Sequence, residues 1–213
     1  MIFLPSVLLY SEANVLSSVL SSLTSLVAAV TLFDRIHWKN LVFPLIGCLS
    51  STYFAVSFVK SRDHDTLLGI LGFALLVLSI YFFFFSERIK IKPTWYAGLI
   101  AGILSGVLSG MFAIGGPPVV LYYMQSEDEN DKYMATISAY FVLSGVISIA
   151  TKAANGFFNA NVWWGLAVGV VFMLIGASAG KFFRGKIQPR FLRKAVYALM
   201  AGSGIVNLVT ALR

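Results

Sequence analysis

The residue pattern best suited to chemistry lies at residues 110–119, which read GMFAIGGPPV. Gly115 and Gly116 let other groups approach the backbone closely, and Pro117 and Pro118 prevent a helix from continuing through them. Proline suits the first turn of a new helix, so a helix is predicted to begin near Pro117 or Pro118. Free N–H groups and the positive dipole end at such a start attract anions. The pattern predicts an anion site at a broken helix; an ordinary proline kink is the alternative.

Hydroxyl side chains accompany this segment and are candidate ligand donors. Ser105 and Ser109 precede it at a spacing of four, and Ser17 and Ser18 belong to a hydroxyl-rich stretch near the N-terminus. Thr136 occupies the comparable helix of the second half of the chain. These residues are predicted to contact the substrate. The alternative for each is a hydrogen bond back to its own helix.

Other titratable residues give little support for catalysis or metal binding. Lys152, with Asn155, is a candidate for attracting an anion at the mouth of a pathway, and snorkelling from a helix end is the alternative. The acidic run at 127–131 is predicted to be a solvated loop. His37 and His64 lie in separate loops with no Cys or His neighbours, which makes them poor candidates for metal ligands. We therefore predict no catalytic residue, no metal site and no cofactor.

The elements that must position these residues are membrane-spanning helices. The chain has 213 residues, of which 58% are hydrophobic and 12% charged. Its apolar residues form helix-length blocks, which in lipid must be helical because a helix satisfies its own backbone. We predict an all-α polytopic transmembrane bundle over 1–213 as a single domain. The net charge of +7 comes from Lys and Arg between the blocks, which indicates contact with membrane lipid rather than nucleic acid.

Two internal repeats are predicted, at 1–92 and 93–213. Pro5 and the residues after it (PSVLLY) resemble Pro118 and the residues after it (PVVLYY), and each is followed by comparable blocks. If 94–125 enters and leaves the membrane on the same side, twelve of the sixteen Lys and Arg residues lie on one side of the membrane and four on the other. If 94–125 is a simple crossing, the two sides hold nine and seven. The positive-inside rule favours the first arrangement, which makes the repeats inverted. A single broken, tilted helix at 94–125 stays open, because 94–112 alone is long enough to span.

Glycines recur every four residues at Gly98, Gly102, Gly106 and Gly110. This spacing places them on one helical face, which predicts close packing against another helix rather than a ligand site.

Residues 102–122 (GILSGVLSGMFAIGGPPVVLY) resemble the second-repeat signature of the TauE/SafE sulfite exporter family, also called the toluene sulfonate uptake permease family. Residues 135–136, 140–141 and 34–38 also fit its pattern, so the resemblance covers nearly the whole chain. It implies a multi-pass permease for sulfite, sulfonates or related small organic anions. Carried over, Gly115, Gly116, Pro117 and Pro118 form the core motif, and Pro5 is their counterpart in the first repeat.

One departure from the family is the short segment before Pro5, so the first repeat is expected to be incomplete at its N-terminus. The expected function is transport of a small anionic substrate by alternating access, not enzymatic catalysis, in a bacterial cytoplasmic membrane. An anion channel, or a non-transporting membrane subunit such as a truncated paralogue, is the alternative. The sequence leaves the anion, the direction of transport, the coupling ion and the oligomeric state open.

Overall fold

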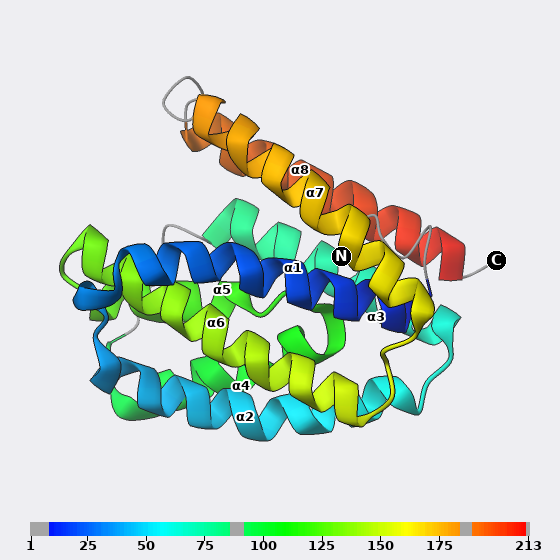
Figure 1. Ribbon diagram of the computed structural model, residues 1–213, viewed down its shortest axis with the longest axis horizontal. Coiled ribbons are helices and arrows are strands. Elements are labelled where there is room, and N and C mark those ends of the chain that lie inside the picture. Colours follow the sequence, from blue (N-terminus) through cyan, green and yellow to red (C-terminus); the bar gives the residue numbers. More distant parts are fainter. Residues whose placement is uncertain (1–8, 86–91, 184–188, 212–213) are drawn as a thin grey trace. The chain divides into compact units, whose positions relative to one another are not determined.

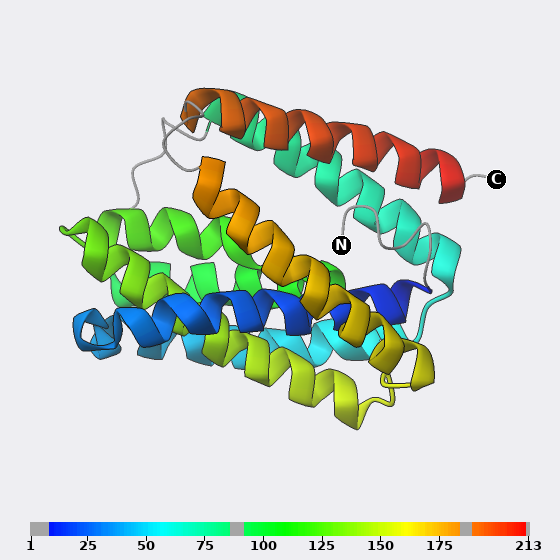
Figure 2. The same cartoon turned by 45° about the horizontal axis from the view of Figure 1, so that its top comes forward.

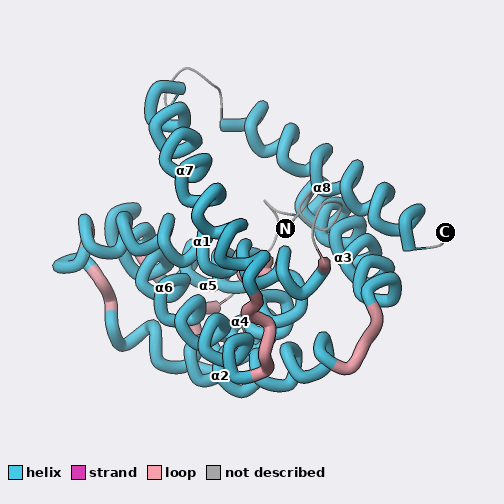
Figure 3. Tube along the Cα trace, turned by 45° about the vertical axis from the view of Figure 1, so that its right-hand side comes forward, coloured by secondary structure: helices cyan, strands magenta, loops and turns pink. Residues whose placement is uncertain are grey.

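The computed structural model describes residues 9–85, 92–183 and 189–211 of the chain, and these residues are helical with no strand among them (Figure 3). The prediction of an all-α fold is confirmed. The helices, in chain order, are α1 (Tyr10–Thr31), the short 3-10 helix η2 (Phe33–Arg35), α2 (Trp38–Lys60), α3 (His64–Phe85), α4 (Trp95–Phe112), α5 (Gly116–Ser126), α6 (Asn130–Ala154), α7 (Ala160–Phe183) and α8 (Pro189–Ala211).

Four of these helices, α1, α2, α4 and α6, are long and apolar enough to cross a membrane. Large apolar side chains such as Phe54, Ile100 and Val146 are more than half exposed on them. An apolar surface of this kind is stable against acyl chains and costly in water. The chain is therefore an integral, multi-pass membrane protein.

The described helices form two compact units, which we treat separately. Unit 1 contains 11–61 and 90–167, and so holds α1, α2, α4, α5, α6 and the first turns of α7. Its long helices run roughly along one direction (Figure 1). Unit 2 contains 62–89 and 168–213, with α3, α8 and the rest of α7. Within it α3 and α8 lie side by side (Figure 2), crossing where the backbones of Gly72 and Gly204 meet.

The tightest helix pair of unit 1 is α2 with α4, and the glycine stripe lies in that interface. A Cβ on Gly102 would overlap the carbonyl oxygen of Pro44, and one on Gly110 would lie 2.7 Å from the Cβ of Ala55. At Gly106 the backbones are close enough for the Thr52 hydroxyl to donate to the Gly106 carbonyl at 3.3 Å. The prediction that this stripe serves helix packing is confirmed.

The two predicted repeats and their inverted relation stay predictions. Unit 1 combines helices from both halves of the sequence, so the contacts that build it are long-range ones.

Candidate functional site

The site begins where α4 ends and α5 starts, in the Gly-Gly-Pro-Pro segment. Ala113 has φ 54°, a left-handed conformation that turns the chain out of α4. Its N–H bonds to the Ser109 carbonyl at 3.0 Å, and the Ile114 N–H bonds to the Leu108 carbonyl at 3.2 Å. α5 then begins at Gly116, with prolines in its first turn. The Gly115 backbone packs closely against α4, since a Cβ there would lie 2.8 Å from the Ser105 carbonyl oxygen.

A cavity of about 150 Å³ lies beside this turn, inside unit 1. It is bounded by three candidate membrane spans and the turn itself, and most of its lining residues are serine or glycine. The lining residues are Ser18, Ser21 and Ser22 of α1, Ser105 and Ser109 of α4, Ala113, Ile114, Gly115 and Gly116 of the turn and α5, and Phe141, Ser144, Gly145 and Ser148 of α6. These serines lie near the middle of α1 and in the second halves of α4 and α6.

Several hydroxyls of the lining are already bonded to protein groups. Ser105 donates to the Gly115 carbonyl at 2.5 Å and accepts from the Tyr140 hydroxyl at 2.9 Å. Ser18 and Ser22 donate to carbonyls one turn earlier in α1, at 2.9 Å each. Ser148 differs, because its hydroxyl is fully buried and has no hydrogen-bond partner among the described residues. A buried hydroxyl without a partner is costly, so Ser148 is available to a ligand in the cavity.

The turn supplies backbone donors as well. Gly115 and Gly116 line the cavity, and their N–H groups make no hydrogen bond within the described part of the chain. Pro117 and Pro118 have no N–H, so the free donors at the start of α5 are those of the two glycines. The positive end of the α5 dipole is directed to the same place.

Lys152 belongs to the last turn of α6, but its ammonium group lies next to Ser18 of the cavity lining. Its side chain is 0% exposed, because helix side chains lean toward the N-terminus and this one reaches back into the bundle. The ammonium donates to Asn14 Oδ1 at 2.7 Å and Ser18 Oγ at 2.5 Å, and lies 3.5 Å from the Ser109 carbonyl oxygen. No carboxylate of the described residues lies within ion-pair distance, so the neighbours of this cation are all neutral.

Asn14 connects Lys152 to the helix break. Its Nδ2 donates to the carbonyls of Gly110 at 3.2 Å and Met111 at 2.5 Å, which belong to the last turn of α4. Carbonyls there have no partner within the helix. The asparagine therefore caps α4 with one end of its amide and holds the lysine with the other.

The structure brings together five of the residues predicted to bind substrate, since Ser18, Ser105, Ser109, Gly115 and Gly116 all line the cavity. Pro117 and Pro118 form the first turn of α5 beside the cavity and do not line it.

The other three predicted residues lie elsewhere. Ser17 is half-buried and not in the lining. The Thr136 hydroxyl accepts a hydrogen bond from the His37 N–H at 3.0 Å, away from the cavity. Pro5 lies outside the described residues.

Sequence reasoning missed Ser148 and the depth of Lys152. The spacing of Ser144, Ser148 and Lys152 at i, i+4 and i+8 was the available signal, because it places all three on one face of α6. Asn155 does not join Lys152, since its amide donates to the Thr151 carbonyl of its own helix at 2.9 Å. Among the described residues, no three His, Cys, Asp or Glu side chains lie close enough together to hold a metal ion.

Helices long enough to cross a bilayer define the class of a polytopic membrane protein, here with a polar cavity inside its bundle. The chain belongs to the sulfite exporter TauE/SafE family, whose family model matches residues 1–206. It is accordingly a membrane protein of a transporter family. No curated protein and no solved structure gives a significant match to the chain.

Proposed function

We propose that the chain is a permease for a small anion, such as sulfite, an organosulfonate or a related sulfur-containing or organic anion. The observation that carries the proposal is Lys152, a buried lysine whose hydrogen-bond partners are all neutral, next to a cavity of hydroxyls. A buried charge without a partner is strongly unfavourable, and an anion in the cavity compensates it. The family supports transport as the activity.

The cavity offers donors on several sides of such an anion. Gly115 and Gly116 line the cavity at the start of α5, and Ser148, whose hydroxyl has no partner among the described residues, lines it from α6. Oxygen atoms of a sulfite or sulfonate group accept hydrogen bonds from donors of this type, and the helix dipole adds to the attraction. The negative end of the α4 dipole lies at the same break, but its repulsion of an anion is reduced because Asn14 caps that end.

Transport follows if this site is exposed first to one side of the membrane and then to the other. Helix breaks at depth are a feature of transporters in which two repeats rock about a central site. We assign this alternating-access mechanism to the inverted repeats 1–92 and 93–213, in a bacterial cytoplasmic membrane.

The test is flux of radiolabelled sulfite and methanesulfonate into proteoliposomes that contain the purified chain. Saturable flux is expected for the wild type. Gly116→Leu is expected to abolish it by filling the cavity, whereas Gly116→Ala is the matched control, because its Cβ would meet only the Phe141 ring, at 3.6 Å. Normal flux in Gly116→Leu would refute the site. Flux that does not saturate would indicate a channel, and no flux would indicate a non-transporting subunit.

A further inference from the structure

A second buried charge lies at the opposite end of α5 from the cavity. Glu127 follows the last residue of α5 and belongs to the acidic run predicted to be a solvated loop. Its side chain is only 2% exposed, whereas that of Glu129 is 53% exposed. The solvated-loop prediction is therefore wrong for Glu127. A carboxylate in this environment requires specific partners.

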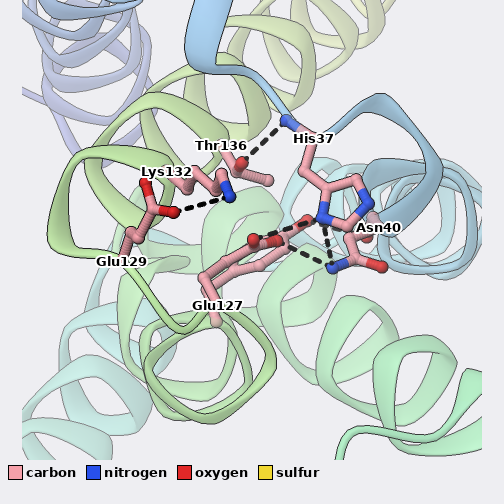
Figure 4. Close-up of polar contacts among 7 residues, drawn as sticks. His37, Asn40, Glu127, Glu129, Lys132 and Thr136 are labelled. Atoms are coloured by element: carbon pink, nitrogen blue, oxygen red, sulfur yellow. Dashed lines mark hydrogen bonds and ion pairs between the residues drawn. The ribbon is translucent and has the colours of Figure 1, made fainter.

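Those partners come from the start of α2 (Figure 4). Asn40 Nδ2 donates to Glu127 Oε1 at 2.7 Å, and His37 Nδ1 lies 3.2 Å from Glu127 Oε2. The Tyr123 hydroxyl, one turn earlier in α5, donates to the Asn40 carbonyl at 3.3 Å. The imidazole of His37 is 48% exposed, so it connects the buried carboxylate with solvent.

The other charges in this region are engaged elsewhere. Lys132 of α6 donates to Glu129 at 2.8 Å, and Arg35 of η2 lies 3.8 Å from the same carboxylate. The hydrogen bond and charge of Lys132, with a smaller contribution from Arg35, lower the pKa of Glu129. The remaining titratable groups that face Glu127 are the phenols of Tyr122 and Tyr123 on α5. Lys132 is also close enough to Glu127 for an electrostatic interaction, but among the described residues only His37 lies within ion-pair distance of Glu127.

A pair of this composition is suited to hold a single exchangeable proton. With the imidazole neutral, the pair carries one negative charge in a buried position; after one proton is taken up, the pair is neutral overall. Imidazole is the side chain that changes charge between pH 5 and 8. Its exposed edge gives the proton a route from water to the carboxylate.

The helix α5 links this pair to the cavity. It spans 11 residues, from Gly116 in the cavity lining to Ser126 beside Glu127, a length of roughly 16 Å. An anion at its N-terminus and an added positive charge at its C-terminus both interact favourably with its dipole. The two ligands also carry opposite charges, so each attracts the other directly along the helix, which is positive coupling between the two sites.

We propose that the His37–Glu127 pair binds the proton that is transported together with the anion. The inference rests on the proposed function, because it assigns the coupled ion of the same permease. One monovalent anion and one proton then move together, and the transported charge sums to zero.

The test uses proteoliposomes that contain the full chain and a trapped pH-sensitive dye, with a gradient of methanesulfonate as the probe. Methanesulfonate keeps its single charge across neutral pH, so any pH effect belongs to the protein. In the wild type, uptake is expected to acidify the lumen and to be indifferent to an imposed membrane potential. The apparent KM is expected to fall as the pH decreases from about 8 to about 6, by up to about tenfold per pH unit for one linked proton.

Glu127→Gln keeps the shape of the side chain and an acceptor oxygen for Asn40, but it replaces the oxygen that faces His37 with an amide nitrogen and removes the charge. This variant is expected to carry methanesulfonate without acidification and with flux that responds to the membrane potential. Glu129→Gln is the matched control, because this neighbouring carboxylate is exposed, and it is expected to behave as the wild type. If Glu127→Gln does not fold, His37→Gln gives the same readouts.

Saturable flux without proton movement in the wild type would overturn the proton site and leave the anion permease intact. Proton movement that persists unchanged in Glu127→Gln or His37→Gln would equally overturn the assignment to this pair. Absence of methanesulfonate and sulfite flux from the wild type would instead refute the permease itself.

Discussion

Replacement of Lys152 by methionine separates an anion-binding role from a structural one. Methionine has a similar length but no charge, so the substitution removes the ammonium and keeps most of the packing. Ser18 lines the cavity and its Oγ lies 2.5 Å from the ammonium nitrogen. An anion one hydrogen-bond length beyond Ser18 is therefore roughly 5 Å from the charge. At an effective dielectric constant of about 20, the lost attraction is about 3 kcal/mol, or roughly two orders of magnitude in affinity.

The same substitution is expected to leave the stability of the fold unchanged or to raise it. A loss of anion affinity without a loss of stability would distinguish an anion-binding role from a structural one. The Lys152→Met substitution would leave the Asn14 amide oxygen without its donor, at a cost of about 1–3 kcal/mol. It would also remove the desolvation cost of a buried, unpaired ammonium, which amounts to several kcal/mol. We therefore expect the thermal midpoint in detergent to be unchanged or higher, while anion binding collapses.

The assay is equilibrium binding of radiolabelled sulfite to the purified protein, together with thermal unfolding of the same samples. Lys152→Arg retains the charge and is expected to keep part of the affinity. Lys132→Met is the matched control on the same helix, since Lys132 is exposed and paired with Glu129. Wild-type affinity in Lys152→Met would refute the electrostatic role, and a joint loss of stability and affinity would indicate that the lysine is structural.

Three further outcomes are expected. Ser148→Ala removes a hydroxyl that has no partner among the described residues, so it is expected to reduce sulfite affinity by roughly two- to tenfold without lowering the thermal midpoint. Gly102→Ala forces a Cβ against the Pro44 backbone and is expected to destabilise the fold by at least about 1–3 kcal/mol in chemical unfolding; Gly202→Ala, with no described atom within 4 Å of its Cβ, is the neutral control. Asp63→Ala removes the carboxylate that accepts from the N–H and hydroxyl of Thr66 at the start of α3. Those bonds lower the pKa of Asp63, so their contribution to the stability of the fold is present near neutral pH and is lost as the pH falls through the acidic range. The variant is expected to unfold at a lower temperature than the wild type near neutral pH, and to lose this pH dependence of stability.

Much of the fold follows from local sequence signals. Apolar blocks of spanning length predicted the long helices, and the four-residue spacing of glycines predicted a close helix contact, because both depend on residues close together in the chain. The end of α4 and the start of α5 also fall where the glycines and prolines of 115–118 place them. Ser105 and Ser109 line one cavity for a similar reason, since hydroxyls four residues apart share a helical face.

The two buried charges could not be predicted in this way. Lys152 stands near a helix end, where a lysine usually snorkels to the membrane surface, and its burial depends on Asn14, which is 138 positions away. Glu127 lies in a run of acidic residues that looks solvated, and its burial depends on Asn40, 87 positions away. In both cases the deciding contact is an asparagine on a different helix, which no periodicity within one segment reveals.

The positions of these charges also explain why one short helix is central to the mechanism. Lys152 is not paired with Glu127, although a direct ion pair would compensate both charges. Instead, the cation lies behind the cavity at the start of α5, and the carboxylate lies just past the end of α5 with a solvent-accessible imidazole. Each charge can then be compensated by a mobile species, an anion at one end and a proton at the other. The dipole of α5 favours an anion and a positive charge at these same two ends, and the opposite charges of the two proposed occupants attract each other along the helix.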